Sequence, residues 1–219
     1  MVKKMMAAPM IQAAQTPRAS GDASFASQCL GEFLSRVRRV DPHPAVLDLG
    51  VLCGANIAFL GAKGCRVSVE SLPAALPETA ARGQSPEKGN PTPISPLGYP
   101  PESFSGVLAW DSISRMTVAD AGHFVATLWR LLMDGGVILA YFPGGPGNAA
   151  TSAGRYRILA ENRLVVEAAP KHTLSVPTAS FQNRDIYTLF SRFDVVRLSQ
   201  LKSGTREVLV ARTRRPGKA

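Results

Sequence analysis

The sequence is poor in residues that bind metals or form disulfides. Its 219 residues include three cysteines and three histidines. The cysteines, Cys29, Cys53 and Cys65, are an odd set without CxxC spacing, and the histidines lie far apart. We therefore expect buried reduced thiols, no metal site and a cytoplasmic location.

Long hydrophobic runs are also missing. No apolar run approaches the roughly 18 residues that a membrane-spanning helix needs. The most apolar stretch, GGVILAYF, has the length of a buried strand. The N-terminus has a basic start and a weakly apolar middle, which Pro9 interrupts too early for a secretory signal. We expect a flexible leader over residues 1–20 and no membrane partner.

Acidic residues are the minority, with 16 Asp and Glu against 25 Lys and Arg and a net charge of +9. Seven of the cations lie near the two ends of the chain: Lys3, Lys4, Arg18, Arg212, Arg214, Arg215 and Lys218. The domain between them is therefore only mildly basic. A solvated basic tail over residues 213–219 is the main interpretation, and weak attraction to nucleic acid is the alternative.

Strand and helix patterns alternate over residues 21–212, which predicts one domain. The segment DASFASQCLGEFLSRVRRV predicts an amphipathic helix capped by Asp22. The strands AVLDLG and CRVSVE flank a short helix, NIAFLGAKG, that ends at Gly64. Such a strand–helix–strand pattern with short connections favours a parallel sheet.

Residues 71–103 contain eight of the seventeen prolines, which predicts an irregular sheet edge. The strand SGVLAW follows, and then a helix with Thr117 and Asp120 as a capping box and a Gly135–Gly136 stop. After the strand VILAYF we expect an insertion over residues 143–182, with a hairpin that turns at 161–162. The last helix, NRDIYTLFSRF, precedes the strands FDVVRLS and REVLVAR, which are expected to be antiparallel because their connection is short.

Three stretches resemble motifs of class I S-adenosylmethionine (SAM)-dependent methyltransferases. Within that class the chain is most similar to the small bacterial type 11 group. They are VLDLGVLCG, SFSGVLAWDSI and LWRLLMDGGVILAYF, and the resemblance covers roughly residues 25–212. It implies a Rossmann-like α/β fold with three α/β/α layers. The doubly wound sheet would be mostly parallel, with one C-terminal antiparallel strand.

The resemblance also implies a cofactor site for SAM. Asp48, Gly50, Leu52 and Gly54 match the glycine-rich loop that wraps the methionine part of SAM. Glu70 lies 22 positions after Asp48, where the family places an acid on the ribose hydroxyls. As alternatives, Asp48 is a carboxylate that fixes the turn, Glu70 is a solvated acid, and the glycines serve tight packing.

Ala109, Trp110 and Asp111 follow the next strand, where the resemblance places the loop under the sulfonium and beside the methyl acceptor. Asp111 is a weak candidate for a general base, because its pKa would have to be raised by burial. Strand capping is the alternative for Trp110 and Asp111. The aromatics at 141, 142, 156 and 181 either line an acceptor pocket or pack in the core.

Departures from the family pattern cluster around the cofactor. Leu52 replaces the second glycine of the loop, which would cost about 1–2 kcal/mol if its backbone were left-handed. The segment NPTPISPLGYP has no acid for the adenine amino group, and Ser105 stands where the family often has aspartate.

Two functions from different classes therefore remain. The first is a SAM-dependent methyltransferase that acts on a small-molecule acceptor. The second is a catalytically inactive, methyltransferase-like protein that binds or scaffolds a protein partner. An NAD-dependent enzyme is the least favoured, because the sequence has no GxGxxG spacing.

Overall fold

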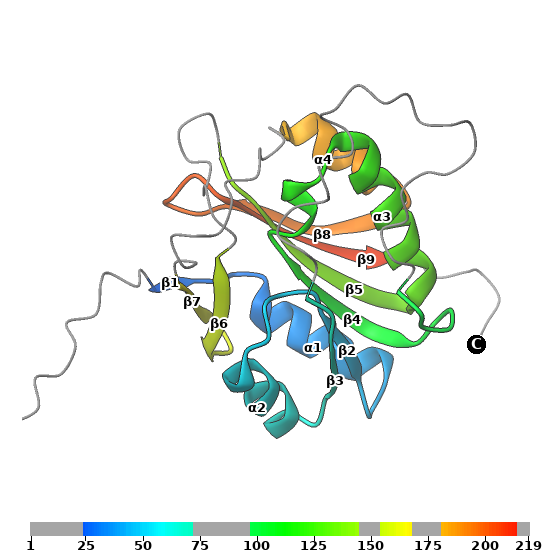
Figure 1. The fold of residues 1–219 in the computed structure, drawn as a ribbon, viewed down its shortest axis with the longest axis vertical. Coiled ribbons are helices and arrows are strands. Elements are labelled where there is room, and N and C mark those ends of the chain that lie inside the picture. Colours follow the sequence, from blue (N-terminus) through cyan, green and yellow to red (C-terminus); the bar gives the residue numbers. More distant parts are fainter. Residues whose placement is uncertain (1–23, 72–96, 145–153, 168–180, 214–219) are drawn as a thin grey trace, which may run out of the picture.

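The computed structural model describes residues 24–71, 97–144, 154–167 and 181–213 (Figure 1). The expected leader, the basic tail, most of the proline-rich segment and parts of the insertion lie outside these residues. The elements are β1 (Ser24–Ala26), α1 (Leu30–Val40), β2 (Ala45–Asp48), α2 (Gly54–Ala62), β3 (Arg66–Val69), β4 (Phe104–Trp110), the 3₁₀ turn η2 (Ile113–Arg115), α3 (Val118–Leu131), β5 (Leu132–Phe142), β6 (Arg155–Ala160), β7 (Arg163–Glu167), α4 (Asn183–Leu189), β8 (Phe193–Gln200) and β9 (Arg206–Arg212). None of the described helices is long and apolar enough to cross a membrane.

A six-stranded sheet in the order β3-β2-β4-β5-β9-β8 forms the centre of the fold. Strands β3, β2, β4 and β5 are parallel, whereas β9 runs antiparallel to both of its neighbours. Chain order reverses direction between β2 and β4, so that the carboxyl ends of β2, β3 and β4 share one edge. This topology confirms the predicted doubly wound sheet and its antiparallel C-terminal strand.

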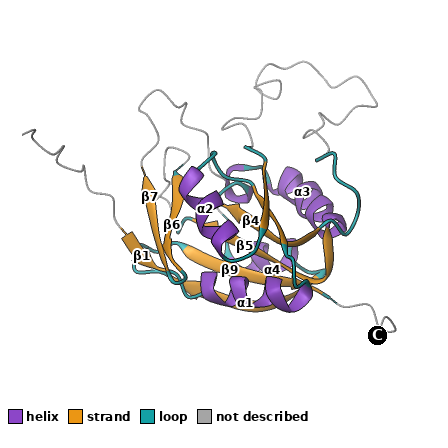
Figure 2. Cartoon of the chain, turned by 90° about the horizontal axis from the view of Figure 1, so that it is seen from below, coloured by secondary structure: helices purple, strands orange, loops and turns teal. Residues whose placement is uncertain are grey.

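Helices cover both faces of this sheet. Apolar residues of α1 pack with Val46, Leu108 and Leu139 on one face, and those of α3 pack with Val107 and Ile138 on the other. Figure 2 shows α1 and α3 on opposite sides of the sheet, and Leu60 of α2 packs in the same cluster as α1. Strand β4 is buried along its whole length because both faces are covered.

A small antiparallel sheet, β1-β7-β6, lies beside the main one. Strands β6 and β7 form the predicted hairpin, whose turn is at Glu161–Asn162. Strand β1 pairs with β7 through the register Phe25–Leu164. The insertion after β5 thus returns to join the residues that precede α1.

Three sequence predictions need correction. The first helix does not run from Asp22, since Ser24–Ala26 is a strand and α1 begins at Leu30. Helix α3 ends at Leu131 and passes straight into β5, so the two glycines lie inside that strand. Arg212 does not belong to a solvated tail. It is buried at the end of β9, where it pairs with Glu102 and Asp134.

A buried carboxylate, Glu207 on β9, holds the start of α1. It is fully buried and accepts hydrogen bonds from the backbone amides of Gln28 and Cys29 at 2.9 and 3.2 Å. The hydroxyls of Tyr141, at 2.7 Å, and Ser27 also donate to it. A negative charge at a helix N-terminus is favourable, and these donors replace the water that burial removes.

Replacing Glu207 by glutamine should destabilise the protein by about 2–4 kcal/mol, since an amide removes the charge and presents an NH₂ group to donors. Urea unfolding would measure this loss. Glu161→Gln is the matched control, because that exposed carboxylate pairs only with Lys63 at the surface, and it should change nothing measurable. Equal stability of both variants would contradict the role given to Glu207.

Candidate cofactor site

The carboxyl ends of β2 and β4 bring two predicted site residues into direct contact. Asp48 ends β2, and Trp110 ends β4. The indole Nε1 of Trp110 donates a hydrogen bond to Oδ1 of Asp48 at 2.6 Å, and the backbone amide of Gly50 donates to the same oxygen at 2.9 Å. Oδ1 of Asp48 is therefore hydrogen-bonded to other groups of the protein.

Trp110 covers the glycine loop. A Cβ built on Gly50 would lie 2.7 Å from Cδ1 of the indole, so no atom fits between the ring and the loop. The Trp110 backbone has φ +48°, a left-handed conformation that costs a bulky residue about 1–2 kcal/mol. The hydrogen bond and the packing of the ring offset this strain. At this position a glycine would not be strained, but it would leave the space above Gly50 empty.

Three aromatic rings continue from the loop into the small sheet. Trp110 stacks on Tyr156 of β6 with ring centroids 5.1 Å apart, and Tyr156 stacks on Tyr141 of β5 at 5.2 Å. The buried side chain of Asn56 on α2 fixes the same strand, since it donates to the Tyr156 carbonyl and accepts from the Ile158 amide. The hairpin thus contacts residues on both sides of the glycine loop, Trp110 through stacking and Asn56 through hydrogen bonds.

Leu52 does not block the site. Its side chain is 60% exposed. Among the described residues other than glycine, only Glu102 and Trp110 have a positive φ. The left-handed strain considered for Leu52 is therefore absent. The residue that fills the space over the loop is Trp110, which sequence reasoning placed in the site without anticipating the direction of its ring.

Glu70 lies next to Asp48, as expected for two acids at one sheet edge. Its backbone amide donates to the Asp48 carbonyl at 2.9 Å. Its carboxylate accepts a hydrogen bond from the Tyr99 hydroxyl at 2.8 Å. Tyr99 was not predicted from the sequence. The family pattern has an acid in the region of NPTPISPLGYP, and it gives a tyrosine hydroxyl there no role.

Asp111 follows Trp110 and is only 6% exposed. Burial raises the pKa of its carboxyl above the ordinary value, and the Arg115 guanidinium, 3.5 Å away, counteracts part of that rise. This is the direction that a general base needs.

The remaining predicted residues lie at the following places in the fold. Ala109 is buried in the core on the face that α3 covers. Gly54 begins α2 with open space around it. The Ser105 hydroxyl contacts the backbone amide and carbonyl of Ala45 at 2.9 and 3.2 Å, so it joins β4 to the start of β2. No group of three or more His, Cys, Asp or Glu gathers within the described ranges.

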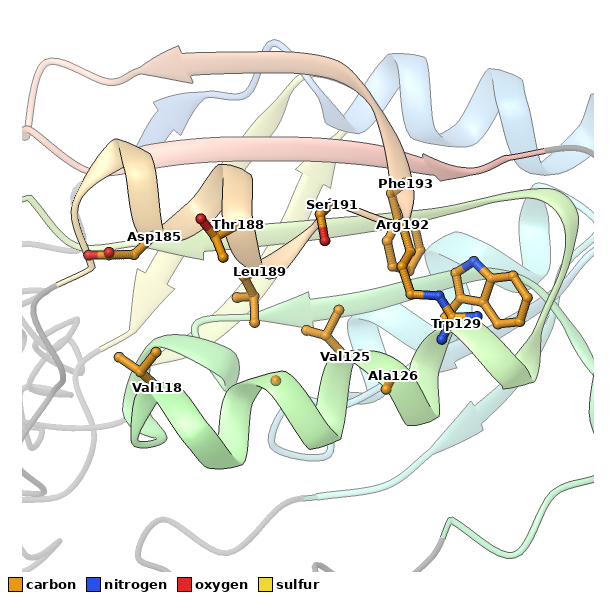
Figure 3. A pocket seen from close by; sticks show the side chains of 11 residues that line it. Val118, Val125, Ala126, Trp129, Asp185, Thr188, Leu189, Ser191, Arg192 and Phe193 are labelled. Atoms are coloured by element: carbon orange, nitrogen blue, oxygen red, sulfur yellow. The ribbon is translucent and has the colours of Figure 1, made fainter.

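Two cavities lie away from the glycine loop. One, of about 710 Å³, is lined by Asp111, Tyr141 and Tyr156 together with residues of β1 and of the β8–β9 turn. Phe142 and Phe181, which shared a predicted pocket with these tyrosines, pack in the core instead. The other cavity, of about 330 Å³, lies between α3 and α4 (Figure 3). There the Arg192 guanidinium stacks over the Trp129 ring at 4.1 Å.

Comparison by sequence gives no relatives. No family model matches the chain, and no curated protein matches it. Comparison of structures does find likenesses. A SAM-dependent methyltransferase from Mesorhizobium loti aligns with a TM-score of 0.50 and 14% identity over 78% of this chain and 91% of that one.

Two further solved structures are similar. The 4+2 cyclase SpnF aligns with a TM-score of 0.50 and 12% identity over 85% of this chain and 80% of that one. The 1,6-didemethyltoxoflavin-N1-methyltransferase of Burkholderia thailandensis, solved with bound 1,6-didemethyltoxoflavin and S-adenosylhomocysteine, aligns with a TM-score of 0.48 and 19% identity over 85% of this chain and 79% of that one. At these identities the likeness concerns the fold alone, and one fold supports different chemistries.

The contact between Trp110 and the loop predicts opposite effects for two glycines. Gly50→Ala should destabilise the protein by about 1–3 kcal/mol, because its methyl group would overlap the indole. Gly54→Ala, with nothing within 4 Å, should leave stability unchanged or raise it by up to about 1 kcal/mol. Urea unfolding of both variants would test this. A tolerated Gly50→Ala would mean that Trp110 does not pack on the loop.

The burial of Asp48 predicts a pH dependence. Burial raises the pKa of Asp48, and the hydrogen bonds from Trp110 and Gly50 limit that rise. The unfolded state then ionises first as pH increases, so wild type loses stability as pH rises through the folded pKa. Asp48→Asn has no such loss. Its free energy of unfolding relative to wild type should increase from about pH 4 to pH 7. A constant difference in unfolding experiments across this range would refute the prediction.

Proposed function

We propose that this chain, which has the fold of class I SAM-dependent methyltransferases, is a binding protein that does not transfer methyl groups. The observation that supports this proposal is the position of Trp110, which fills the space over Gly50 and donates to Asp48. In the family these two residues face the methionine part of SAM. Here they face an indole.

The residues at this edge do not fit SAM as they stand. The methionine part would need the surface of Gly50, and the indole already lies in contact with it. The adenosine part would need Glu70, which accepts the Tyr99 hydroxyl. A ligand could compete with that hydroxyl, but it would have to displace the buried ring of Trp110.

Displacing Trp110 costs free energy. It breaks a hydrogen bond to a carboxylate, worth about 1.5–3 kcal/mol, and a stack on Tyr156 worth about 0.5–1.5 kcal/mol. The sum, about 2–4.5 kcal/mol, lowers the affinity for SAM by a factor of roughly 30 to 2,000. Leu52 alone would not produce a loss of this size, since it is exposed and unstrained.

The second candidate function is SAM-dependent methyl transfer to a small-molecule acceptor. Two observations favour it. Asp48 and Glu70 are neighbours at the expected strand ends, and burial raises the pKa of Asp111 beside a cavity. SAM would be its cofactor, held by Glu70 and the glycine loop, and it would supply the methyl group as a sulfonium. This candidate requires Trp110 to leave the loop.

The cysteines support the expected cytoplasmic location. All three are free and buried. Burial raises the pKa of the Cys29 thiol to about 12 and also raises that of Cys65, so these two are inert packed thiols. Reduced cysteines are usual in a reducing compartment.

Calorimetric titration with SAM and with S-adenosylhomocysteine separates the two functions. We expect the wild-type chain to bind these ligands no more tightly than tens of micromolar, because displacing Trp110 weakens a micromolar site by at least about 30-fold. Glu70→Ala should then make no difference. Binding of micromolar affinity that Glu70→Ala abolishes would overturn the proposal in favour of the enzyme.

A further inference from the structure

The larger cavity has the properties of a ligand site. Its volume of about 710 Å³ lies in the range of small-molecule pockets. Five separate parts of the chain meet there: the start of the described fold at β1, the residue after β4, the end of β5, the hairpin strands β6 and β7, and the β8–β9 turn. The glycine loop lies outside its lining, and the cavity is connected to the end of β4 through Asp111 and through Tyr156, which stacks on Trp110.

The lining includes one carboxylate, Asp111, whose ion pair with Arg115 is long. The backbone amides of Asp111 and Gly154 favour its charged form, which lowers its pKa against the rise that burial causes. Its charged partner, Nη2 of Arg115, is 3.5 Å from Oδ1, whereas a hydrogen bond between such ions is about 2.7–2.9 Å long. The carboxylate is almost fully buried, so it retains acceptor capacity for which water competes poorly.

Aromatic rings form the walls beside this carboxylate. Tyr141 and Tyr156 are stacked 5.2 Å apart, and Phe25 meets Tyr141 edge-on with centroids 6.0 Å apart. Both tyrosines are held in place, Tyr141 by Glu207 and Tyr156 by Trp110. Rigid aromatic walls favour a planar apolar ligand, and their faces also attract cations.

The other charged group in the lining is Lys202, on the β8–β9 turn. Its side chain is exposed, so solvent and salt screen its charge, unlike that of Asp111. Uncharged amide and hydroxyl side chains from Gln28, Gln200 and Thr205 complete the polar part. Although Arg115 offsets part of its charge, Asp111 is screened less by solvent than Lys202 and so has more influence on the charge of a bound ligand.

We propose that this cavity binds a small aromatic amine, with the ammonium group on Asp111 and the ring against Tyr156 and Phe25. The inference assigns a ligand class to the binding role proposed above. The amine donates a hydrogen bond to the free capacity of the Asp111 carboxylate. A ligand of the same shape with a carboxylate at that end would instead meet a buried like charge.

Calorimetry with tryptamine and indole-3-acetate tests this without any variant. The two probes share an indole ring and carry opposite charges. We expect tryptamine to bind the wild-type chain at least about tenfold more tightly than indole-3-acetate. Equal binding, no binding of either, or tighter binding of the acid would overturn the proposal.

Asp111→Asn locates the charge. It should weaken tryptamine binding by about tenfold or more and leave indole-3-acetate no weaker. Asp194→Asn, an exposed acid on β8 outside the cavity lining, is the matched control and should change neither. Circular dichroism would verify the fold of both variants. An unchanged tryptamine affinity in folded Asp111→Asn would also refute the assignment.

The two proposals fail separately. Tryptamine binding by a chain that also binds SAM would keep the amine site and overturn the non-catalytic role. Absence of both would remove the amine site alone, since the SAM titration tests a different set of residues.

Discussion

The hydrogen bond between Trp110 and Asp48 connects most of what is distinctive in this molecule. It joins the ends of β2 and β4, turns the indole onto Gly50 and presents its other face to Tyr156. The hairpin of the insertion is held by that contact and by Asn56. At the edge where a doubly wound sheet normally binds a ligand, the indole thereby lies against the glycine loop.

Most of the architecture could be predicted from the sequence. Apolar periodicity, turn residues and connection lengths located the strands, the hairpin and the antiparallel end of the sheet. The errors have tertiary causes. Phe25 fits a helical stripe, but its pairing with Leu164 makes it part of a strand. Arg212 reads as part of a basic tail, but Glu102 and Asp134 make its burial tolerable.

The positions of the predicted site residues could be inferred from the sequence, and the arrangement of their side chains could not. Spacing placed Asp48, Glu70 and Trp110 at one edge, which the structure confirms. Whether a cofactor can reach the glycine loop depends on the direction of the Trp110 side chain. That direction follows from the left-handed backbone at Trp110 and from partners 46 or more positions away in the sequence. No local pattern encodes such contacts. A comparison of motifs identifies Leu52, because it detects a missing glycine. It does not detect the ring of Trp110, which comes from another strand.

The three-ring stack also bears on how such a protein could change in evolution. A smaller residue at 110 would uncover Gly50, but it would remove the support of Tyr156 and leave a void under the hairpin. A shorter hairpin would expose Trp110 to water without freeing the loop. Neither step alone restores an open edge, so each is disfavoured unless the other is already present. Opening this edge would therefore require two coupled changes, an epistatic barrier set by the packing of three side chains.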